Sequence, residues 1–276
     1  MSSRRFSYSR FSTFDQCPAR YRMIYLEGRP TAGESIEAFL GSRLHETLEW
    51  LYRERKGSRA VLFDALLERY RELWREAWHA YIHIADPAWK TDDYYQLGQR
   101  SLAGYFRQHA PFDEPVEGVE RTISFEVTSG QQGGAGQAGD GYLMTAILDR
   151  LDHHGAGWWS IHDYKSGKRM LTASNAEKDL QMKVYFLALT ESQPSVERVD
   201  VVWHYLRHGR ELRLESVGWD PKRIAAMVRK RIDKLRAAEA EPSLLAPKES
   251  ILCNWCYYWD VCPAKQGQTH PARLAD

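Results

Sequence analysis

The sequence lacks several features that would define its class at once. No stretch approaches the eighteen or more apolar residues of a membrane span, and the N-terminus MSSRRFSYSRFSTF has no apolar run of the signal-peptide kind. A phosphate-binding G-x-x-x-x-G-K-[ST] motif is also missing, because the nearest fragment, SGKR at 166–169, has arginine where a hydroxyl is needed. These absences predict a soluble, cytoplasmic protein that has no ATP motor of its own.

Excess charge is missing too. The 276 residues include 38 Lys and Arg against 37 Asp and Glu, so a nucleic acid would have to bind a local basic surface and not a field over the whole molecule. Hydrophobic residues make up 43% of the chain, enough for one large domain or two smaller ones with a genuine core. The neutral balance neither supports nor excludes DNA as a partner.

Cysteine is scarce, but three of the four cysteines gather near the C-terminus in ILCNWCYYWDVCPAK. Cys253 and Cys256 are two residues apart and Cys262 follows after five more, whereas Cys17 lies far upstream in FDQCPARY. Disulfides are rare inside cells, so a metal site is the preferred interpretation, and four thiolates can hold either zinc or an iron–sulfur cluster. Proline after Cys17 and after Cys262, with aromatic residues around the tail cysteines, favours iron and sulfur.

A ligand set drawn from both ends of the chain would connect the two termini. Metal-binding energy becomes folding energy at such a site, so loss of the metal should loosen both ends. Unrelated buried thiols and a redox pair of Cys253 and Cys256 are the alternatives. The redox pair would leave Cys17 and Cys262 without a role.

Periodicity predicts a mixed sheet flanked by helices, with further helices inserted before the sheet. Apolar residues recur at helical spacing in some segments, and β-branched and aromatic residues dominate others, with HHGAG as a hairpin turn. The expected helices cover 11–28, 35–57, 59–78, 92–110, 177–192 and 220–241, and the expected strands cover 119–128, 143–154, 158–165 and 198–206.

Local signals refine this α/β assignment. Ser12 and Asp15 have the spacing of a capping box, and the helix that they would start carries Cys17 into the interior. Gly57 would stop the second helix. The segment TSGQQGGAGQAGDG at 128–141 has no periodicity and is expected to be a mobile loop.

Two acids and a lysine fall on the expected strands. Asp163 and Lys165 are two apart in IHDYKSGK, so on a strand their side chains point to the same face. Asp149 lies on the preceding strand across the hairpin, where its carboxylate could complete a site for a divalent cation. A surface salt bridge between solvated charges is the simpler interpretation of the same residues.

The order of the motifs along the chain resembles that of the PD-(D/E)XK nucleases, in the RecB-like branch that carries a four-cysteine iron–sulfur staple. AddB helicase–nuclease subunits and CRISPR-associated spacer-acquisition exonucleases are related members. The matching motifs are SYSRFSTFDQCPARY, GSRLHE, AILDRLD, HDYKSGK, QMKVY and the cysteine tail. The resemblance implies one nuclease domain over 1–276 with a restriction-endonuclease-like core, divided into a staple at 1–30 and 245–265, a helical insertion at 59–112 and a catalytic α/β core at 113–240.

The resemblance also implies roles for single residues. His45, Asp149 and Asp163 would bind the metal, with Lys165 as the catalytic lysine. Gln181, four residues before Tyr185 on one helical face, begins the glutamine–tyrosine motif beside the active site.

Further ligands follow from the same resemblance. Glu120 matches an acidic position often seen in the family. The cofactors implied are a Mn²⁺ or Mg²⁺ ion and a [4Fe–4S] cluster held by Cys17, Cys253, Cys256 and Cys262. A histidine ligand predicts better activity with manganese than with magnesium.

The function implied is that of a metal-dependent DNA nuclease. It would act as an exonuclease on single-stranded or free-ended DNA in repair, recombination or CRISPR adaptation, with DNA and a helicase or CRISPR integration complex as partners. A non-catalytic DNA-binding assembly subunit is one alternative, and a zinc-stapled RNA-processing protein is another. An assembly subunit would be expected to lose the acids or the lysine, so the presence of all of them favours the enzyme.

Overall fold

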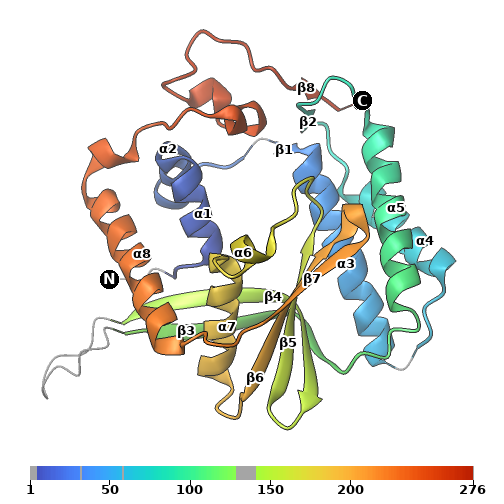
Figure 1. The fold of residues 1–276 in the computed structure, drawn as a ribbon. Coiled ribbons are helices and arrows are strands. Elements are labelled where there is room, and N and C mark those ends of the chain that lie inside the picture. The colour runs from blue at the N-terminus through green and yellow to red at the C-terminus, as the bar shows by residue number, and fades with distance from the viewer. Residues whose placement is uncertain (1–4, 32, 58, 129–140, 276) are drawn as a thin grey trace, which may run out of the picture.

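A five-stranded mixed sheet forms the centre of the computed structural model, which describes residues 5–31, 33–57, 59–128 and 141–275 (Figure 1). The strand order is β3-β4-β5-β6-β7, in which β5 and β6 are parallel and the other neighbours are antiparallel. The strands are β3 (Val116–Val127), β4 (Tyr142–Gly155), β5 (Trp158–Lys165), β6 (Arg198–Tyr205) and β7 (Arg210–Glu215).

The four strands expected from the sequence are confirmed. The turn between β4 and β5 uses Gly155, Ala156 and Gly157, all with positive φ, as the HHGAG segment predicts. The sequence does not predict β7, because RELRLE is rich in charged residues and forms an exposed edge strand. The expected glycine-rich loop at 128–141 falls almost entirely outside the described residues.

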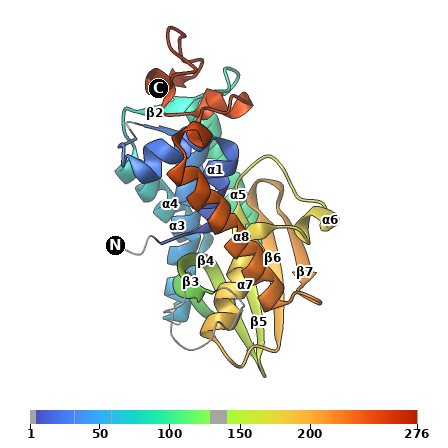
Figure 2. The ribbon, with the colours of Figure 1, turned by 90° about the vertical axis from the view of Figure 1, so that its left-hand side faces the viewer.

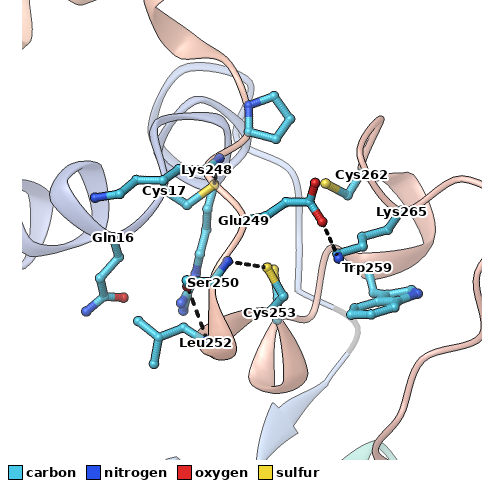
Figure 3. Close-up of a pocket in the computed structure, with 13 residues that line it drawn as sticks. Gln16, Cys17, Lys248, Glu249, Ser250, Leu252, Cys253, Trp259, Cys262 and Lys265 are labelled. Atoms are coloured by element: carbon cyan, nitrogen blue, oxygen red, sulfur yellow. Dashed lines mark hydrogen bonds and ion pairs between the residues drawn. The ribbon is translucent and has the colours of Figure 1, made fainter.

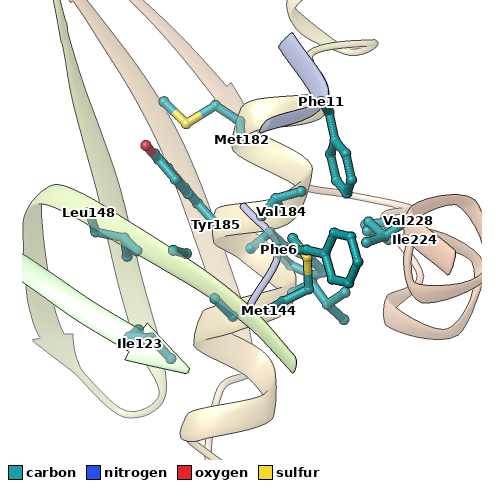
Figure 4. Packing of buried hydrophobic residues seen from close by; sticks show 14 of the residues in the cluster. Phe6, Phe11, Ile123, Met144, Leu148, Met182, Val184, Tyr185, Ile224 and Val228 are labelled. Atoms are coloured by element: carbon teal, nitrogen blue, oxygen red, sulfur yellow. The ribbon is translucent and has the colours of Figure 1, made fainter. Parts of the chain in front are cut away.

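Helices cover both faces of the sheet (Figure 2). On one face, Met144, Ala146 and Leu148 alternate along β4 and pack with α7 (Leu180–Ser192) and α8 (Pro221–Ala240). Figure 4 shows Phe6 of the N-terminal segment beside Met144, and Phe11 belongs to the same cluster. The first core is therefore built from the centre of the chain together with both of its ends.

A second core lies between the remaining long helices. The expected helices are confirmed as α3 (Ile36–Lys56), α4 (Phe63–Ala77) and α5 (Thr91–His109). Tyr164 of β5 belongs to this core, whereas Ile161 of the same strand belongs to the first. The end of β5 is therefore the place where the two cores meet.

The first helix differs from the prediction. Helix α1 (Tyr8–Gln16) begins at Ser7, whose side chain accepts from the N–H of Arg10, so the capping box expected at Ser12 is wrong. The helix ends at Cys17, which is extended and half-buried, so Cys17 does not lie in the interior. Pro18 explains the break, because the residue before a proline is pushed out of the helical region and proline suits the first turn of a new helix.

Short elements complete the fold. A three-stranded sheet in the order β1-β2-β8 joins the N-terminal segment to the C-terminal tail. These elements are α2 (Pro18–Tyr21), the π-helix η1 (Arg22–Leu26), α6 (Ala173–Ala176), β1 (Glu34–Ser35), β2 (Ile82–Ile84), β8 (Arg273–Leu274) and the 3-10 helices η2 (Leu206–His208), η3 (Pro242–Leu245), η4 (Ile251–Trp255) and η5 (Trp259–Val261). Among the described residues, no helix has the length and apolar character needed to cross a membrane.

Candidate functional site

Two acids and a lysine meet where β4 and β5 run side by side. Lys165 Nζ lies 2.7 Å from Asp163 Oδ2, as expected for residues two apart on one strand. Asp149 Oδ2 accepts a hydrogen bond of 2.7 Å from the backbone N–H of Tyr164. Asp149 is 8% and Asp163 2% exposed, so neither carboxylate is an ordinary solvated charge.

Helix α7 fixes the position of the lysine. Lys165 Nζ donates to Gln181 Oε1 at 2.8 Å, and Gln181 Nε2 donates to the hydroxyl of Tyr185, also at 2.8 Å. Asp179 caps this helix by accepting from the backbone N–H groups of Gln181 and Met182. Asp179 is not among the residues predicted from the sequence, although an aspartate directly before the apolar run LQMKVYF is a recognisable N-cap signal.

Helix α3 brings a histidine to the same place from the second core. His45 Nε2 donates to the carbonyl oxygen of Tyr164 at 2.9 Å, and its Nδ1 lies 3.6 Å from Asp149 Oδ2. Gly41 lies one turn earlier, where a Cβ would come within 3.1 Å of Ser166 Oγ. The loop that follows Lys165 therefore packs closely against the backbone of α3 at Gly41.

A third carboxylate completes this group. Glu120 Oε1 lies 4.0 Å from His45 Nδ1, and His45, Glu120 and Asp149 each offer a ligand atom within 4.8 Å of the other two. The expected set of His45, Asp149 and Asp163 is therefore not the closest one, because Asp163 is turned toward Lys165. Glu120 has a φ of +46°, a left-handed conformation that costs an ordinary residue about 1–2 kcal/mol and is typical of functional sites.

The electrostatics of the group favour a bound cation. Burial raises the pKa of Asp149 to about 7, although the charge on His45 opposes the shift, and burial also raises the pKa of Glu120. The buried Oδ2 of Asp163 makes no directed hydrogen bond, although it contacts Lys165. Carboxylate oxygens with one imidazole suit Mn²⁺ or Mg²⁺, so the residues present fit such an ion.

The raised pKa of Asp149 predicts a pH-dependent stability. The folded state holds a proton on Asp149 up to about pH 7, whereas the unfolded chain releases it near pH 4, so the free energy of unfolding falls as the pH rises between these values. Without a divalent ion, this group should lower stability by about 4 kcal/mol across that window. Urea unfolding should therefore show that the free energy of unfolding of Asp149→Asn, relative to wild type, is higher at pH 8 than at pH 5.

Two controls belong to this measurement. The exposed Asp64 can be replaced by asparagine with no change in the pH profile. Added Mn²⁺ should restore stability to the wild type at pH 8 but not to Asp149→Asn. Parallel pH profiles of Asp149→Asn and wild type in EDTA would contradict the shifted pKa.

The four cysteines lie at a separate place, between α1 and the C-terminal tail (Figure 3). They line one cavity of about 40 Å³, and all four are free and half-buried. Backbone N–H groups of Lys248 and Ser250 lie 3.5 Å from the sulfurs of Cys17 and Cys253. The expected meeting of head and tail around the cysteines is therefore present.

The sulfurs do not converge on a point. Four thiolates about 2.3 Å from one tetrahedral zinc ion would lie about 3.8 Å apart. Among the described residues, which include all four cysteines, no three sulfurs lie within 4.8 Å of one another. The geometry shows a shared cavity and not a closed four-sulfur site.

Two buried acids and a lysine thus lie on neighbouring strands of a mixed α/β sheet. Residues 5–263 match the PD-(D/E)XK nuclease superfamily, and the chain belongs to this superfamily. No curated protein matches the chain.

Two solved structures are similar to the whole chain. One is a "Putative exonuclease" from Eubacterium rectale, with 12% identity and a TM-score of 0.50, which covers 96% of this chain and 89% of its own. The other is the protein SSO0001, with 12% identity and a TM-score of 0.35, covering 90% of this chain and 95% of its own. At this identity, the first match supports the fold alone.

Proposed function

We propose that this protein is a metal-dependent DNA nuclease that acts as an exonuclease on single-stranded or free-ended DNA. The observation that carries the proposal is the position of Lys165 Nζ, 2.7 Å from Asp163 and 2.8 Å from Gln181, beside the buried Asp149. A protein that used this fold only as a clamp would have no need to bury two acids next to an oriented lysine.

Each residue has a part in the proposed hydrolysis. Asp149 and Asp163 would hold a divalent cation, together with His45 or Glu120. A bound Mn²⁺ or Mg²⁺ supplies Lewis-acid stabilisation of the charge that develops on the scissile phosphate. Burial lowers the pKa of Lys165, but the charge and hydrogen bond of Asp163 outweigh burial and raise it. Lys165 is therefore an ammonium that orients the attacking water and stabilises negative charge, and not a general base.

The substrate preference can be tested with two forms of one DNA. The purified protein with Mn²⁺ should degrade a linear single-stranded DNA and leave the closed circular form intact, since an exonuclease needs an end. EDTA should stop the reaction. If the circular DNA were cut at an equal rate, the protein would be an endonuclease and not an exonuclease. Degradation of RNA alone would favour the RNA-processing alternative.

The choice of metal tests the role of His45. Imidazole suits softer ions than magnesium, so the wild type should be faster with manganese. His45→Ala should reduce this preference, because it removes the nitrogen ligand. Equal rates with the two ions, unchanged in His45→Ala, would mean that His45 is not a ligand.

We infer that the cysteine cavity holds an iron–sulfur cluster. The four sulfurs line one cavity but lie too far apart for a single tetrahedral ion, and a cluster of four irons and four sulfides is a larger body. The N–H groups of Lys248 and Ser250 near two sulfurs are the kind of hydrogen bond that tunes such a cluster.

Loss of one ligand should remove the cluster. Protein purified without oxygen should be brown and contain iron and sulfide, whereas Cys256→Ser should lose most of both and unfold at a lower temperature. Asn254→Ala, a change between two of the cysteines, should keep the iron. A colourless wild type that contains zinc and no sulfide would contradict the cluster and leave the nuclease proposal untouched.

We also propose that residues 1–276 form one nuclease domain, with 1–30 and 245–265 at the cluster, a helical insertion at 59–112 and the catalytic core at 113–240. A helicase or a CRISPR integration complex is the proposed protein partner, in DNA repair, recombination or CRISPR adaptation.

A further inference from the structure

A second group of histidines and glutamates lies where α5 meets the β6–β7 edge of the sheet. His109 ends α5, Glu114 precedes β3, His204 lies on β6 and Glu211 lies on the edge strand β7. His109, His204 and Glu211 each offer a ligand atom within 4.8 Å of the other two. Four separate segments of the chain therefore converge there.

The distances are close to those of metal ligands. Glu211 Oε1 lies 3.0 Å from His109 Nε2 and 2.8 Å from His204 Nδ1. Two ligand atoms about 2.1 Å from a tetrahedral ion are about 3.4 Å apart, so Glu211 would have to move outward by about half an ångström. An ion could thus be accommodated with little movement of the three side chains.

Hydrogen bonds determine which nitrogen of His204 carries its proton. A guanidinium nitrogen of Arg150 lies 3.0 Å from Nδ1 and 3.2 Å from Nε2 of His162, but Nε2 also lies 3.0 Å from the carboxylate of Asp152, which only accepts, so Nε2 carries the proton and Nδ1 is the acceptor. His204 Nε2, 2.8 Å from the same atom, must then be the donor. In the neutral imidazole, His204 Nδ1 is left with a lone pair and no proton.

That lone pair faces another acceptor. His204 is 2% exposed, so its ring nitrogens have no solvent partner. Its Nδ1 lies 2.8 Å and the buried Nε2 of His109 lies 3.0 Å from the same carboxylate oxygen of Glu211, and neither contact has the direction of a good hydrogen bond. Two acceptors this close are stable only with a positive charge between them.

The outer contacts are those of metal-bound histidines. His109 Nδ1 donates to Glu114 at 3.2 Å, while its other nitrogen faces Glu211. His204 donates outward to His162 in the same way. Ligating histidines usually donate their second N–H to a carboxylate or another fixed acceptor, which orients the ring.

We propose that His109, His204 and Glu211 form a second metal site that binds one borderline divalent ion such as Zn²⁺. Two imidazoles with one carboxylate suit zinc better than magnesium. The ion would tie α5 to the β6–β7 edge of the sheet and so join the two cores. This site is independent of the proposed nuclease reaction and shares no residue with the candidate catalytic group.

Zinc content per chain tests the site in the full-length protein. Chelator-stripped protein is incubated with Zn²⁺, passed through a desalting column and analysed for metal. Glu211→Gln and His109→Asn should each bind about one ion fewer per chain than wild type, since three protein ligands are needed. Zinc at the cysteines or at the catalytic acids would be the same in all variants and cancels in the comparison.

Matched variants separate a metal site from an ion pair. His79 contacts Glu34 at 3.2 Å and belongs to no three-residue ligand group in the part of the chain that the structure describes, so His79→Asn should bind as much zinc as wild type. Glu114→Gln should weaken zinc binding about 10–100-fold without abolishing it. Glu211 is 36% exposed, so Glu211→Gln should fold even where His109→Asn does not. Equal zinc content in Glu211→Gln and wild type would overturn the proposal and leave a protonated histidine between two glutamates.

Discussion

Replacing Lys165 with alanine should lower the rate of DNA cleavage by about 10²–10³-fold, the usual effect of losing one preorganised charge at a developing anion. The variant should still bind Mn²⁺, because Asp149 and Asp163 remain. The measurement is the initial rate of nucleotide release from linear single-stranded DNA, with circular dichroism to show that the fold is kept.

The matched control lies three residues further along the chain. Lys168 is exposed, contacts Asp86 at 3.3 Å and has no contact with the buried acids, so Lys168→Ala should keep most of the activity. Equal activity of Lys165→Ala and wild type would show either a contaminating nuclease or a different active site. A weaker DNA affinity in Lys168→Ala with an unchanged maximal rate would place Lys168 at the substrate.

Replacing Arg150 with methionine should cause the largest loss of stability, about 3–5 kcal/mol. Arg150 is 1% exposed and contacts Asp152 and His162 at 3.0 Å and the hydroxyls of Tyr52 and Tyr105. Methionine fills much of the volume but leaves the buried carboxylate of Asp152 without its cationic partner. Urea unfolding at pH 7 would measure the loss.

A surface arginine provides the reference. Arg53 pairs with Glu49 one turn earlier on α3 and is 63% exposed, so Arg53→Met should change the free energy of unfolding by less than about 1 kcal/mol. If Arg150→Met were as stable as Arg53→Met, the buried network would have a role in specificity or function and not in stability.

Local periodicity explains why part of the candidate site was predictable. Asp163 and Lys165 lie on one face of a strand, and Gln181 and Tyr185 lie on one face of a helix. The strand and helix periods are therefore enough to pair these side chains from the sequence. The hairpin that places Asp149 beside them is marked by glycines in HHGAG. The strands and long helices followed from the same patterns.

Other features depend on contacts between distant segments and left no local signal. Arg150 looks like a charged residue on a strand, and its burial depends on tyrosines of α3 and α5. Glu120 was expected from the family resemblance alone, and the left-handed backbone through which it reaches His45 is marked by no periodicity. The wide spacing of the cysteine sulfurs likewise depends on how the tail lies against α1.

The contact between Lys248 and Cys17 has a consequence for biosynthesis, because it joins residues 231 positions apart. Ribosomes add about 5–20 residues per second, so Cys17 leaves the exit tunnel roughly ten to fifty seconds before its partners exist. During that interval its thiol is open to oxidation or to capture by other metals. A cofactor at this cavity could therefore reach all four thiols only after Cys262 has been made, and cells short of reducing power should accumulate protein that is oxidised at Cys17.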